Sequence, residues 1–349
     1  MQRLASIWLE RGPLARALWP LSLLYGLLWR MRLALYRSHR LRTTRLAVPV
    51  IVVGNLFAGG AGKTPTVIAT LELLRGAGWT PGVLSRGYGR RHSDLRDVDA
   101  ASDAREVGDE PLLIHLRTRA PVVVQSDRGA AGQALLRRHP EVDVVVCDDG
   151  LQHHALERDV AVLVFDERGA GNGWLLPAGP LREPMPAVAP PASVVLYNAR
   201  RASTALPGHF ASRRLAGAVE LDDWWRGVPA SPALLQALAG RAVVAAAGLA
   251  QPERFFAMLR EAQMLVTPLP LPDHHHFATL PWPPGTADVL LTEKDAVKLR
   301  PSHLGEPAPG AARTRVWVVA LDFEPDAGYG AALLQLLDQR RTDRGSPSA

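Results

Sequence analysis

The chain has 349 residues, of which 47% are hydrophobic and 21% charged, the composition of a globular protein long enough for two domains. Its single cysteine, Cys147, excludes an internal disulfide framework and favours a reducing compartment. The formal net charge of +6 is uneven: residues 1–45 carry nine arginines and one acid, or +8, which leaves −2 on the remainder. The main body therefore lacks the basic character that nucleic-acid binding requires.

The basic N-terminal arm, residues 1–45, contains an uncharged, leucine-rich run of thirteen residues over 17–29, bordered by tryptophans. As a helix this run would span about 20 Å, less than the ~30 Å hydrocarbon core of a bilayer. No small-residue cleavage site follows, so a signal peptide is a poor fit. Tryptophan, tyrosine and arginine around such a run are typical of an interfacial helix among anionic lipid headgroups. The alternative is a helix packed on the protein's own core, and Pro20 and Gly26 argue against one straight helix.

Beyond the arm, short apolar runs alternate with helical stretches. Runs that are apolar throughout indicate strands buried on both faces, and hence a mostly parallel sheet with helices on each side. The expected strands are 48–53, 80–84, 121–124, 142–147, 160–165 and 193–197, then 242–247, 264–267, 289–291 and 316–321. Helices are expected from Pro252 and over 329–339. The sequence therefore predicts an α/β protein.

A glycine loop follows the first of these runs. Its residues are Gly59, Gly60, Ala61, Gly62, Lys63, Thr64 and Pro65. A strand, a glycine loop and a helix in this order present backbone N–H groups to phosphates, with the lysine at the β/γ-phosphates and the threonine on Mg²⁺. Lys63 is one of only three lysines among forty cationic residues, so its compact ammonium is not a generic choice of charge. Phe57 replaces the first glycine of the general pattern, and the alternative is a chance glycine-rich turn.

Acidic clusters follow two further segments. Asp148 and Asp149 come directly after the run that ends in Cys147, which we interpret as a buried small hydrophobe. Carboxylates at that end of a buried strand lie where α/β sheets bind ligands, and they can hold Mg²⁺. Asp109 and Glu110 open a helix, where the helix dipole alone would favour carboxylates.

Two more clusters lie later in the chain. Asp273 precedes three consecutive histidines, 274–276, and adjacent histidines do not easily converge on one ion. We therefore expect a single functional histidine there rather than a zinc site. Thr292 begins the segment that contains Lys294 and is expected to cap a helix, and simple capping is the alternative to a functional role.

The chain closely resembles the tetraacyldisaccharide 4'-kinases, the lipid A 4'-kinases of Gram-negative bacteria, through the ordered strings GNLFAGGAGKTP, SRGYGRR, VGDEP, DDGLQHH, GPLREP, PDHHHF and TEKDAVK. This resemblance implies a kinase that uses ATP and Mg²⁺ to phosphorylate the 4'-hydroxyl of a tetraacylated glucosamine disaccharide 1-phosphate, giving lipid IVA. It also implies a peripheral protein on the cytoplasmic face of the inner membrane. The expected partners are the acylated disaccharide and anionic phospholipid, without nucleic acid or a protein partner.

The resemblance assigns roles to individual residues. Lys63 and Thr64 match the family's P-loop pair, Asp109 its proposed general base, and His274 the histidine that supports that base from the other domain. The expected metal-site residues are Thr64, Asp148, Asp149 and Glu183. Arg86, Tyr88, Arg128, Gln152 and His153 match other polar positions of the site, and Glu110, Asp273 and Lys294 are further candidates from the matched strings. The choice of His274 over His275 depends on the alignment.

The family's architecture is a Rossmann-like P-loop core with a smaller C-terminal α/β domain and the nucleotide between them. On this chain it implies a membrane-associating arm over 1–45, a kinase core over 46–215, a linker region over 216–240, a smaller domain over 241–340 and a disordered tail over 341–349. The alternative function is a membrane-associated P-loop ATPase switch. Such proteins carry a lysine where this chain has Ala58, which counts against it.

Overall fold

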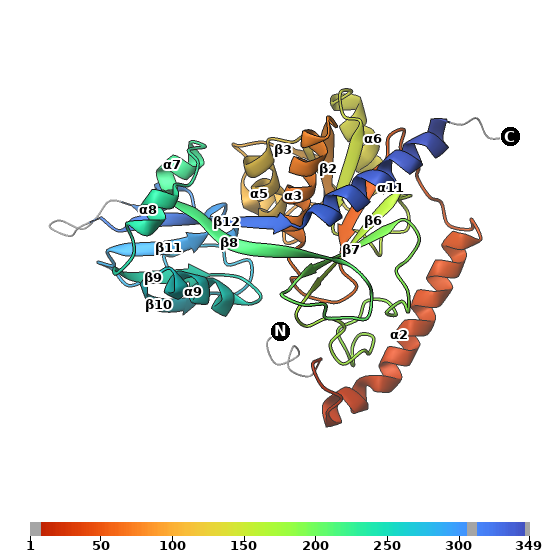
Figure 1. Ribbon diagram of the computed structural model, residues 1–349, viewed down its shortest axis with the longest axis horizontal. Helices are drawn as coiled ribbons and strands as arrows, with labels where there is room; N and C mark the ends of the chain where they lie inside the picture. The colour runs from red at the N-terminus through yellow and green to blue at the C-terminus, as the bar shows by residue number, and fades with distance from the viewer. Residues whose placement is uncertain (1–7, 306–312, 346–349) are drawn as a thin grey trace.

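The computed structural model of the chain describes residues 8–305 and 313–345 (Figure 1). Segments rich in valine, leucine and alanine form the strands of one twelve-stranded, mostly parallel sheet in this part of the chain, and helices pack against it. Most of its strands are buried along nearly their whole length, because helices cover both faces of the sheet. The predicted α/β class is confirmed.

The core part of the sheet contains the strand that precedes the glycine loop. Its strands are β1 (Val50–Gly54), β2 (Pro81–Ser85), β3 (Arg96–Val98), β4 (Val122–Val124), β5 (Val144–Asp148), β6 (Val160–Asp166) and β7 (Ser193–Asn198). All pairs are parallel except that of the edge strand β3 with β4. The helices between them are α3 (Lys63–Gly76), α4 (Ala104–Val107), α5 (Asp109–Thr118) and α6 (Arg128–Arg138). Because parallel strands end at one edge, the loops after β1, β2 and β5 meet there.

A smaller part of the sheet is formed by the second half of the chain. Its strands are β8 (His209–Glu220), β9 (Ala242–Ala247), β10 (Leu265–Pro270), β11 (Asp288–Thr292) and β12 (Arg315–Pro325). Its helices are α7 (Leu221–Trp225), α8 (Pro232–Gln236), α9 (Pro252–Glu261), α10 (Glu293–Ala296) and the short 3-10 helix η1 (Pro301–Leu304). Alternate residues of β12 belong to two hydrophobic clusters, Trp317 and Val319 to one and Val316 and Val318 to the other. This two-residue period gives the smaller part a core on each face of its sheet.

The strand β8 joins the two parts, so the complete order is β10-β9-β11-β12-β8-β7-β6-β1-β5-β2-β4-β3. It begins parallel to β7 at His209 and Phe210 and then runs antiparallel to β12 (Figure 1). The predicted linker over 216–240 is therefore not a plain connection, because it holds the end of β8 together with α7 and α8. The sequence did not reveal β8, because its arginines, histidine and glycine interrupt any apolar run.

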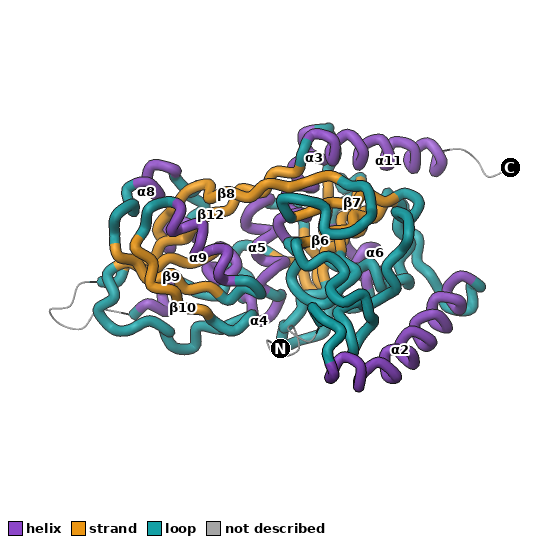
Figure 2. Tube along the Cα trace, turned by 60° about the horizontal axis from the view of Figure 1, so that its bottom comes forward, coloured by secondary structure: helices purple, strands orange, loops and turns teal. Residues whose placement is uncertain are grey.

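The last helix, α11 (Ala327–Gly345), returns to the core part and lies beside α3 (Figure 2). Tyr329 and Leu333 are buried in the core's hydrophobic cluster, and the hydroxyl of Tyr329 lies 2.7 Å from that of Thr70. This corrects two predictions: the helix packs on the kinase core rather than on the smaller domain of 241–340, and it continues through 341–345, part of the predicted disordered tail. Residues 346–349 lie outside the described residues.

Within the N-terminal arm, residues 13–37 form one helix, α2 (Pro13–Arg37), which continues through Pro20 and Gly26. A stripe of small residues packs against the segment that precedes Arg182: the hydroxyl of Ser22 donates to the carbonyl of Leu175 at 2.8 Å, and Gly26 leaves no room for a side chain beside Leu175. The rest of the helix exposes large apolar side chains, namely Leu14, Trp19, Leu21, Leu23, Leu24, Leu27, Leu28, Met31 and Leu35. Among the described helices, none is long and apolar enough to cross a bilayer.

Candidate active site

The glycine loop connects β1 to α3, as predicted. Gly59 and Gly62 have φ values of +109° and +90°, which favour glycine because a side chain would be strained there. Helix α3 begins at Lys63 without a side-chain cap, so its first N–H groups are free to bind an anion. The Lys63 ammonium lies 3.5 Å from a carboxylate oxygen of Asp149 and 3.3 Å from the side-chain oxygen of Asn55. The helix N-terminus, the Lys63 ammonium and the Asp149 carboxylate thus lie together at the glycine loop.

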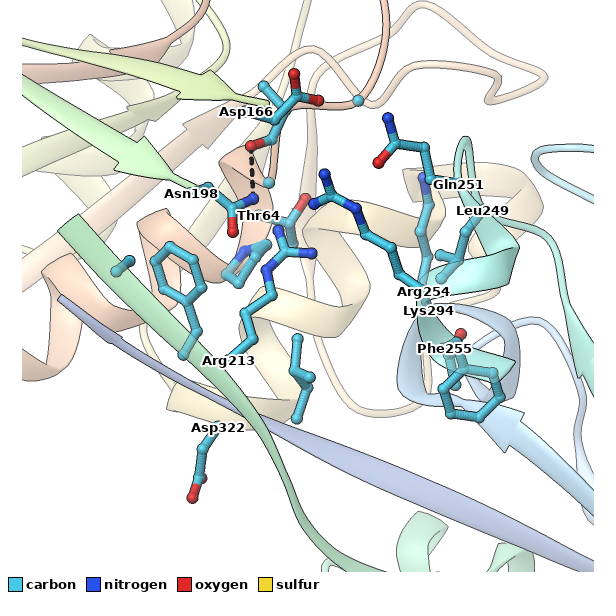
Figure 3. A pocket seen from close by; sticks show the side chains of 18 of the residues that line it. Thr64, Asp166, Asn198, Arg213, Leu249, Gln251, Arg254, Phe255, Lys294 and Asp322 are labelled. Atoms are coloured by element: carbon cyan, nitrogen blue, oxygen red, sulfur yellow. Dashed lines mark hydrogen bonds between the residues drawn. The ribbon is translucent and has the colours of Figure 1, made fainter. Parts of the chain in front are cut away.

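Three side chains hold the carbonyl groups of this loop. Asn55 donates to the carbonyl of Gly59 at 3.0 Å and Arg168 to that of Gly60 at 2.6 Å. Asn198, labelled in Figure 3, donates to the carbonyl of Ala61 at 2.9 Å. With its carbonyls fixed, the loop keeps its shape before any ligand binds.

The departure from the general P-loop pattern at Phe57 also has a structural reason. Its ring is buried, stacks near Phe165 and lies 5.1 Å from the guanidinium of Arg168. Phe57 therefore supports the arginine that holds the loop.

The acid pair at the end of β5 lies beside the loop, and its two members differ. Asp149 is paired with Lys63 and also with Arg182, at 3.2 Å. Asp148 is buried; one oxygen accepts from Ser85 at 3.1 Å, while the other has no hydrogen-bond partner. Burial, followed by the charges of Glu110 and Asp149, raises the pKa of Asp148 to about 7. Asp148 therefore offers a free carboxylate oxygen at the site, and Asp149 does not.

Asp109 and His274 come from the two parts of the molecule and meet directly. Asp109 begins α5 of the core and is only 5% exposed, whereas His274 lies in the loop after β10. Nδ1 of His274 is 2.8 Å from Oδ2 of Asp109. Burial would raise the pKa of Asp109, but the hydrogen bond from His274 and the charge of Lys294 lower it overall. The hydrogen bond to Asp109 likewise raises the pKa of His274, which holds the pair in its ionised form.

The neighbouring histidine is placed differently. The ring of His275 packs edge-on against Phe277 at 4.9 Å, and its Nε2 is buried without a hydrogen-bond partner. Tyr88, which is exposed, lies with its ring 5.4 Å from that of His274. The structure thus joins His274, and not His275, to Asp109.

Lys294 connects the same two segments a second time. Its ammonium lies 3.0 Å from Glu110, the residue after Asp109, and 3.3 Å from Asp273, the residue before His274. Burial lowers the pKa of Lys294, but these carboxylates raise it well above its usual value, so the ammonium stays charged. Thr292 caps the same turn, because its hydroxyl accepts from the N–H of Asp295 at 3.2 Å. In this segment Thr292 caps the helix and Lys294 contacts the candidate site, so the two alternatives, capping and a functional role, do not exclude each other.

Four other predicted residues form two groups at the strand ends. Gln152 donates to Glu183 at 2.8 Å, and burial raises the pKa of Glu183. Among the described residues, no group of three histidine, cysteine or acidic side chains is placed to hold a metal ion, and the metal role of Glu183 stays a prediction. Arg128 is buried and donates to the carbonyl of Asp148 at 3.2 Å. Burial and the charge of Arg128 lower the pKa of His153, whose Nε2 is buried without a partner. The remaining candidate, Arg86, is exposed at the end of β2.

A cavity of about 960 Å³ lies between the glycine loop and the smaller part of the molecule. Its walls include Lys63 and Thr64 from the loop, Glu110 and Asp273, and Lys294. Residues that the sequence did not indicate also line it, among them Asp166, Asn198, Arg213, Gln251, Arg254 and Phe255 (Figure 3). Asp166 and Asn198 end β6 and β7, so a polar residue closing an apolar run was an available signal. Arg213 stands in β8, which the sequence pattern did not reveal.

Proteins of one family match this chain along most of its length. A family model described as tetraacyldisaccharide-1-P 4'-kinase matches residues 14–338. The tetraacyldisaccharide 4'-kinase of Methylibium petroleiphilum is 57% identical over 93% of this chain and 90% of its own length. That of Leptothrix cholodnii is 55% identical over 98% and 97%. A crystal structure of LpxK from Aquifex aeolicus in complex with ATP matches with a TM-score of 0.74 and 26% identity, covering 93% of this chain and 99% of that one.

The resemblance that the sequence strings predicted is thereby confirmed. The chain belongs to the tetraacyldisaccharide 4'-kinase family, whose members phosphorylate the lipid A precursor.

Proposed function

We propose that this protein transfers the γ-phosphate of ATP to the 4'-hydroxyl of a tetraacylated glucosamine disaccharide 1-phosphate, giving lipid IVA. The observation that carries this proposal is the contact between Asp109 and His274, whose sequence neighbours Glu110 and Asp273 line the same cavity as Lys63. A sugar hydroxyl is a weak nucleophile, so its phosphorylation needs a carboxylate that accepts the proton as the bond forms. A membrane ATPase switch, the alternative, would carry a lysine at the position of Ala58.

In this reaction Asp109 takes the proton of the 4'-hydroxyl, and His274 holds the carboxylate in its ionised form. The base and the histidine stand on different parts of the molecule, so closure of the two parts would complete the site. Lys63 and the N–H groups at the start of α3 bind the phosphates and offset their negative charge.

The proposed cation is Mg²⁺, held by the hydroxyl of Thr64 and by the acid pair. Oxygen donors suit Mg²⁺, and the free oxygen of buried Asp148 fits this role better than Asp149, which is already paired with Lys63 and Arg182. When bound, Mg²⁺ would neutralise charge on the β- and γ-phosphates.

We also propose that α2 places the protein on the cytoplasmic face of the inner membrane, as a peripheral protein. Its small-residue stripe packs on the protein, while its leucines and Met31 are exposed and arginines flank them. Such a surface suits an anionic bilayer, in which apolar side chains enter the acyl region and arginines meet headgroups. Four acyl chains keep the disaccharide in the same bilayer, so the arm brings the enzyme to its substrate.

The test measures ATP consumption and glycolipid phosphorylation by the purified protein with the tetraacylated disaccharide 1-phosphate in mixed micelles. We expect ATP consumption that depends on this lipid, and a product with one phosphate more. Steady ATPase activity without lipid, and no phosphorylated glycolipid, would favour the switch protein and reject the kinase.

A further inference from the structure

The side chain of Arg213 reaches the glycine loop from β8, the strand that leaves the core for the smaller part. A Cβ atom built on Gly62 would lie 2.4 Å from Nη2 of Arg213, so the guanidinium rests directly against the loop backbone. Arg213 and Lys63 line the same cavity, and in Figure 3 the guanidinium of Arg213 points toward Thr64. Two cations from distant parts of the chain thus stand at the start of α3.

This guanidinium has little to balance it. Its Nε is buried without a hydrogen-bond partner, and no carboxylate of the described residues lies within ion-pair distance of Arg213. Asp166 is the acid whose charge acts on the pKa of Arg213, but it already forms an ion pair with Arg168 at 2.7 Å. Burial lowers the pKa of Arg213 to about 10, which still leaves it charged at neutral pH. The ring of Phe323 lies 5.6 Å from the guanidinium, but no anion among the described residues balances its charge, and a buried charge without a counter-ion is costly, so the fold holds Arg213 ready for an anion.

The next residue, Arg214, differs from Arg213, because its guanidinium is paired with carboxylates. Neighbouring residues of a strand point to opposite faces. Arg214 is exposed and is paired with Asp322, at 3.0 Å, and with Glu324. Arg254, another arginine that lines the cavity, contacts Glu167. Of these three arginines, Arg213 is the one that contacts Gly62 of the loop.

We propose that Arg213 binds the β- and γ-phosphates of the nucleotide at the glycine loop, as a second cation opposite Lys63. A guanidinium presents a planar pair of donors that suits phosphate oxygens, whereas the lysine acts as a point charge. Spreading positive charge over the transferred phosphoryl group is the main task of a protein in phosphoryl transfer. This assignment rests on the kinase function proposed above and adds a residue from the connecting strand to it.

The experiment compares Arg213→Ala, Arg213→Lys and, as the matched control, Arg214→Ala. Calorimetry measures binding of a non-hydrolysable ATP analogue and of AMP, and steady-state kinetics gives kcat and the KM for ATP. We expect Arg213→Ala to bind the ATP analogue about tenfold to a hundredfold more weakly, the range for a lost hydrogen bond to a charged group. AMP affinity should not change, kcat should fall, Arg213→Lys should lie between, and Arg214→Ala should match the wild type.

An unchanged affinity and kcat in Arg213→Ala would overturn the assignment, as would an equal loss for AMP, which would place the contact at the base, the ribose or the α-phosphate. If Arg213→Ala folds poorly, Arg213→Gln removes the charge, retains a donor and carries the same test. A wild-type protein that binds no ATP, or phosphorylates no disaccharide, would reject the kinase function itself, so the two failures are distinguishable.

Discussion

His274 donates a hydrogen bond to Asp109 across 165 positions of sequence and between the two parts of the sheet, with 2.8 Å between Nδ1 and Oδ2. Lys294 bridges the residues next to them, Glu110 and Asp273. The proposed base is therefore set by the smaller part of the molecule, while the phosphate-binding loop belongs to the core.

The first prediction concerns the pH dependence of this pair. His274→Ala removes the hydrogen bond that lowers the pKa of Asp109, and burial then raises that pKa. Lys294 and Lys298 still lower it in part. Because the base acts in its ionised form, the acidic limb of kcat/KM against pH should move to higher pH, with a loss of about tenfold to a hundredfold at neutral pH. His275→Ala should leave the profile in place, and equal behaviour of the two variants would contradict the assignment.

The same pair should appear in stability measurements. The pKa of His274 is raised in the folded protein, so its contribution to stability is complete below the ordinary imidazole pKa of about 6.5 and is lost as pH rises through the raised pKa. The difference in Tm between the wild type and His274→Ala should therefore shrink on going from about pH 6 to alkaline pH. A difference that stays constant over this range would mean that the pair adds no ionic stabilisation.

The second prediction concerns Lys294. Lys294→Met keeps the length of the side chain but leaves Glu110 and Asp273 without their shared cation. We expect a stability loss of about 1–3 kcal/mol and an acidic limb at higher pH, since the ammonium also lowers the pKa of Asp109. Lys294→Arg should restore the charge but only part of the activity, because a planar fork does not replace a compact ammonium between two carboxylates. Urea denaturation and pH–rate profiles check both effects. Full activity of Lys294→Met would show that the bridge is only structural.

The third prediction separates the two acids of the metal site. Asp148→Asn replaces the free carboxylate oxygen, so Mn²⁺ binding in the presence of an ATP analogue, followed by electron paramagnetic resonance, should weaken about tenfold or more. Compared with Asp148→Asn, Asp149→Asn should weaken Mn²⁺ binding less and change the affinity for ATP more. The reason is that it frees Lys63 and Arg182 from their shared carboxylate. The reverse order of effects would make Asp149 the direct ligand.

The fourth prediction concerns the arm. Replacing Leu24, Leu27 and Leu28 together by Gln should lower binding to anionic vesicles by more than about tenfold, since each buried leucine contributes roughly 1.5–3 kcal/mol. Vesicle flotation measures the fraction of each variant that binds the vesicles. Leu265→Gln is the control, because Leu265 is an exposed leucine far from the arm, in β10. If the triple variant partitions like the wild type, α2 serves only as a packed helix.

The sequence by itself determined the α/β class, the glycine loop, the acids at the end of β5 and the family. These features depend on local order: unbroken apolar runs form buried strands, and the residues after them lie at the ligand edge of the sheet. The two candidate histidines could not be separated in the same way, because both stand in one loop and only packing turns His274 toward Asp109 and His275 toward Phe277.

The tertiary structure decided what depends on contacts between distant segments. It showed β8 as the strand that joins the two parts, placed α11 on the core and brought Arg213 to Gly62. Polar and apolar residues of β8 follow no single period. Along its length this strand meets a cavity, solvent and two different neighbouring strands, β7 and β12. The hydrophobic pattern of a segment indicates which of its residues are buried. The site, however, is formed by the ends of several segments, and these meet only after folding.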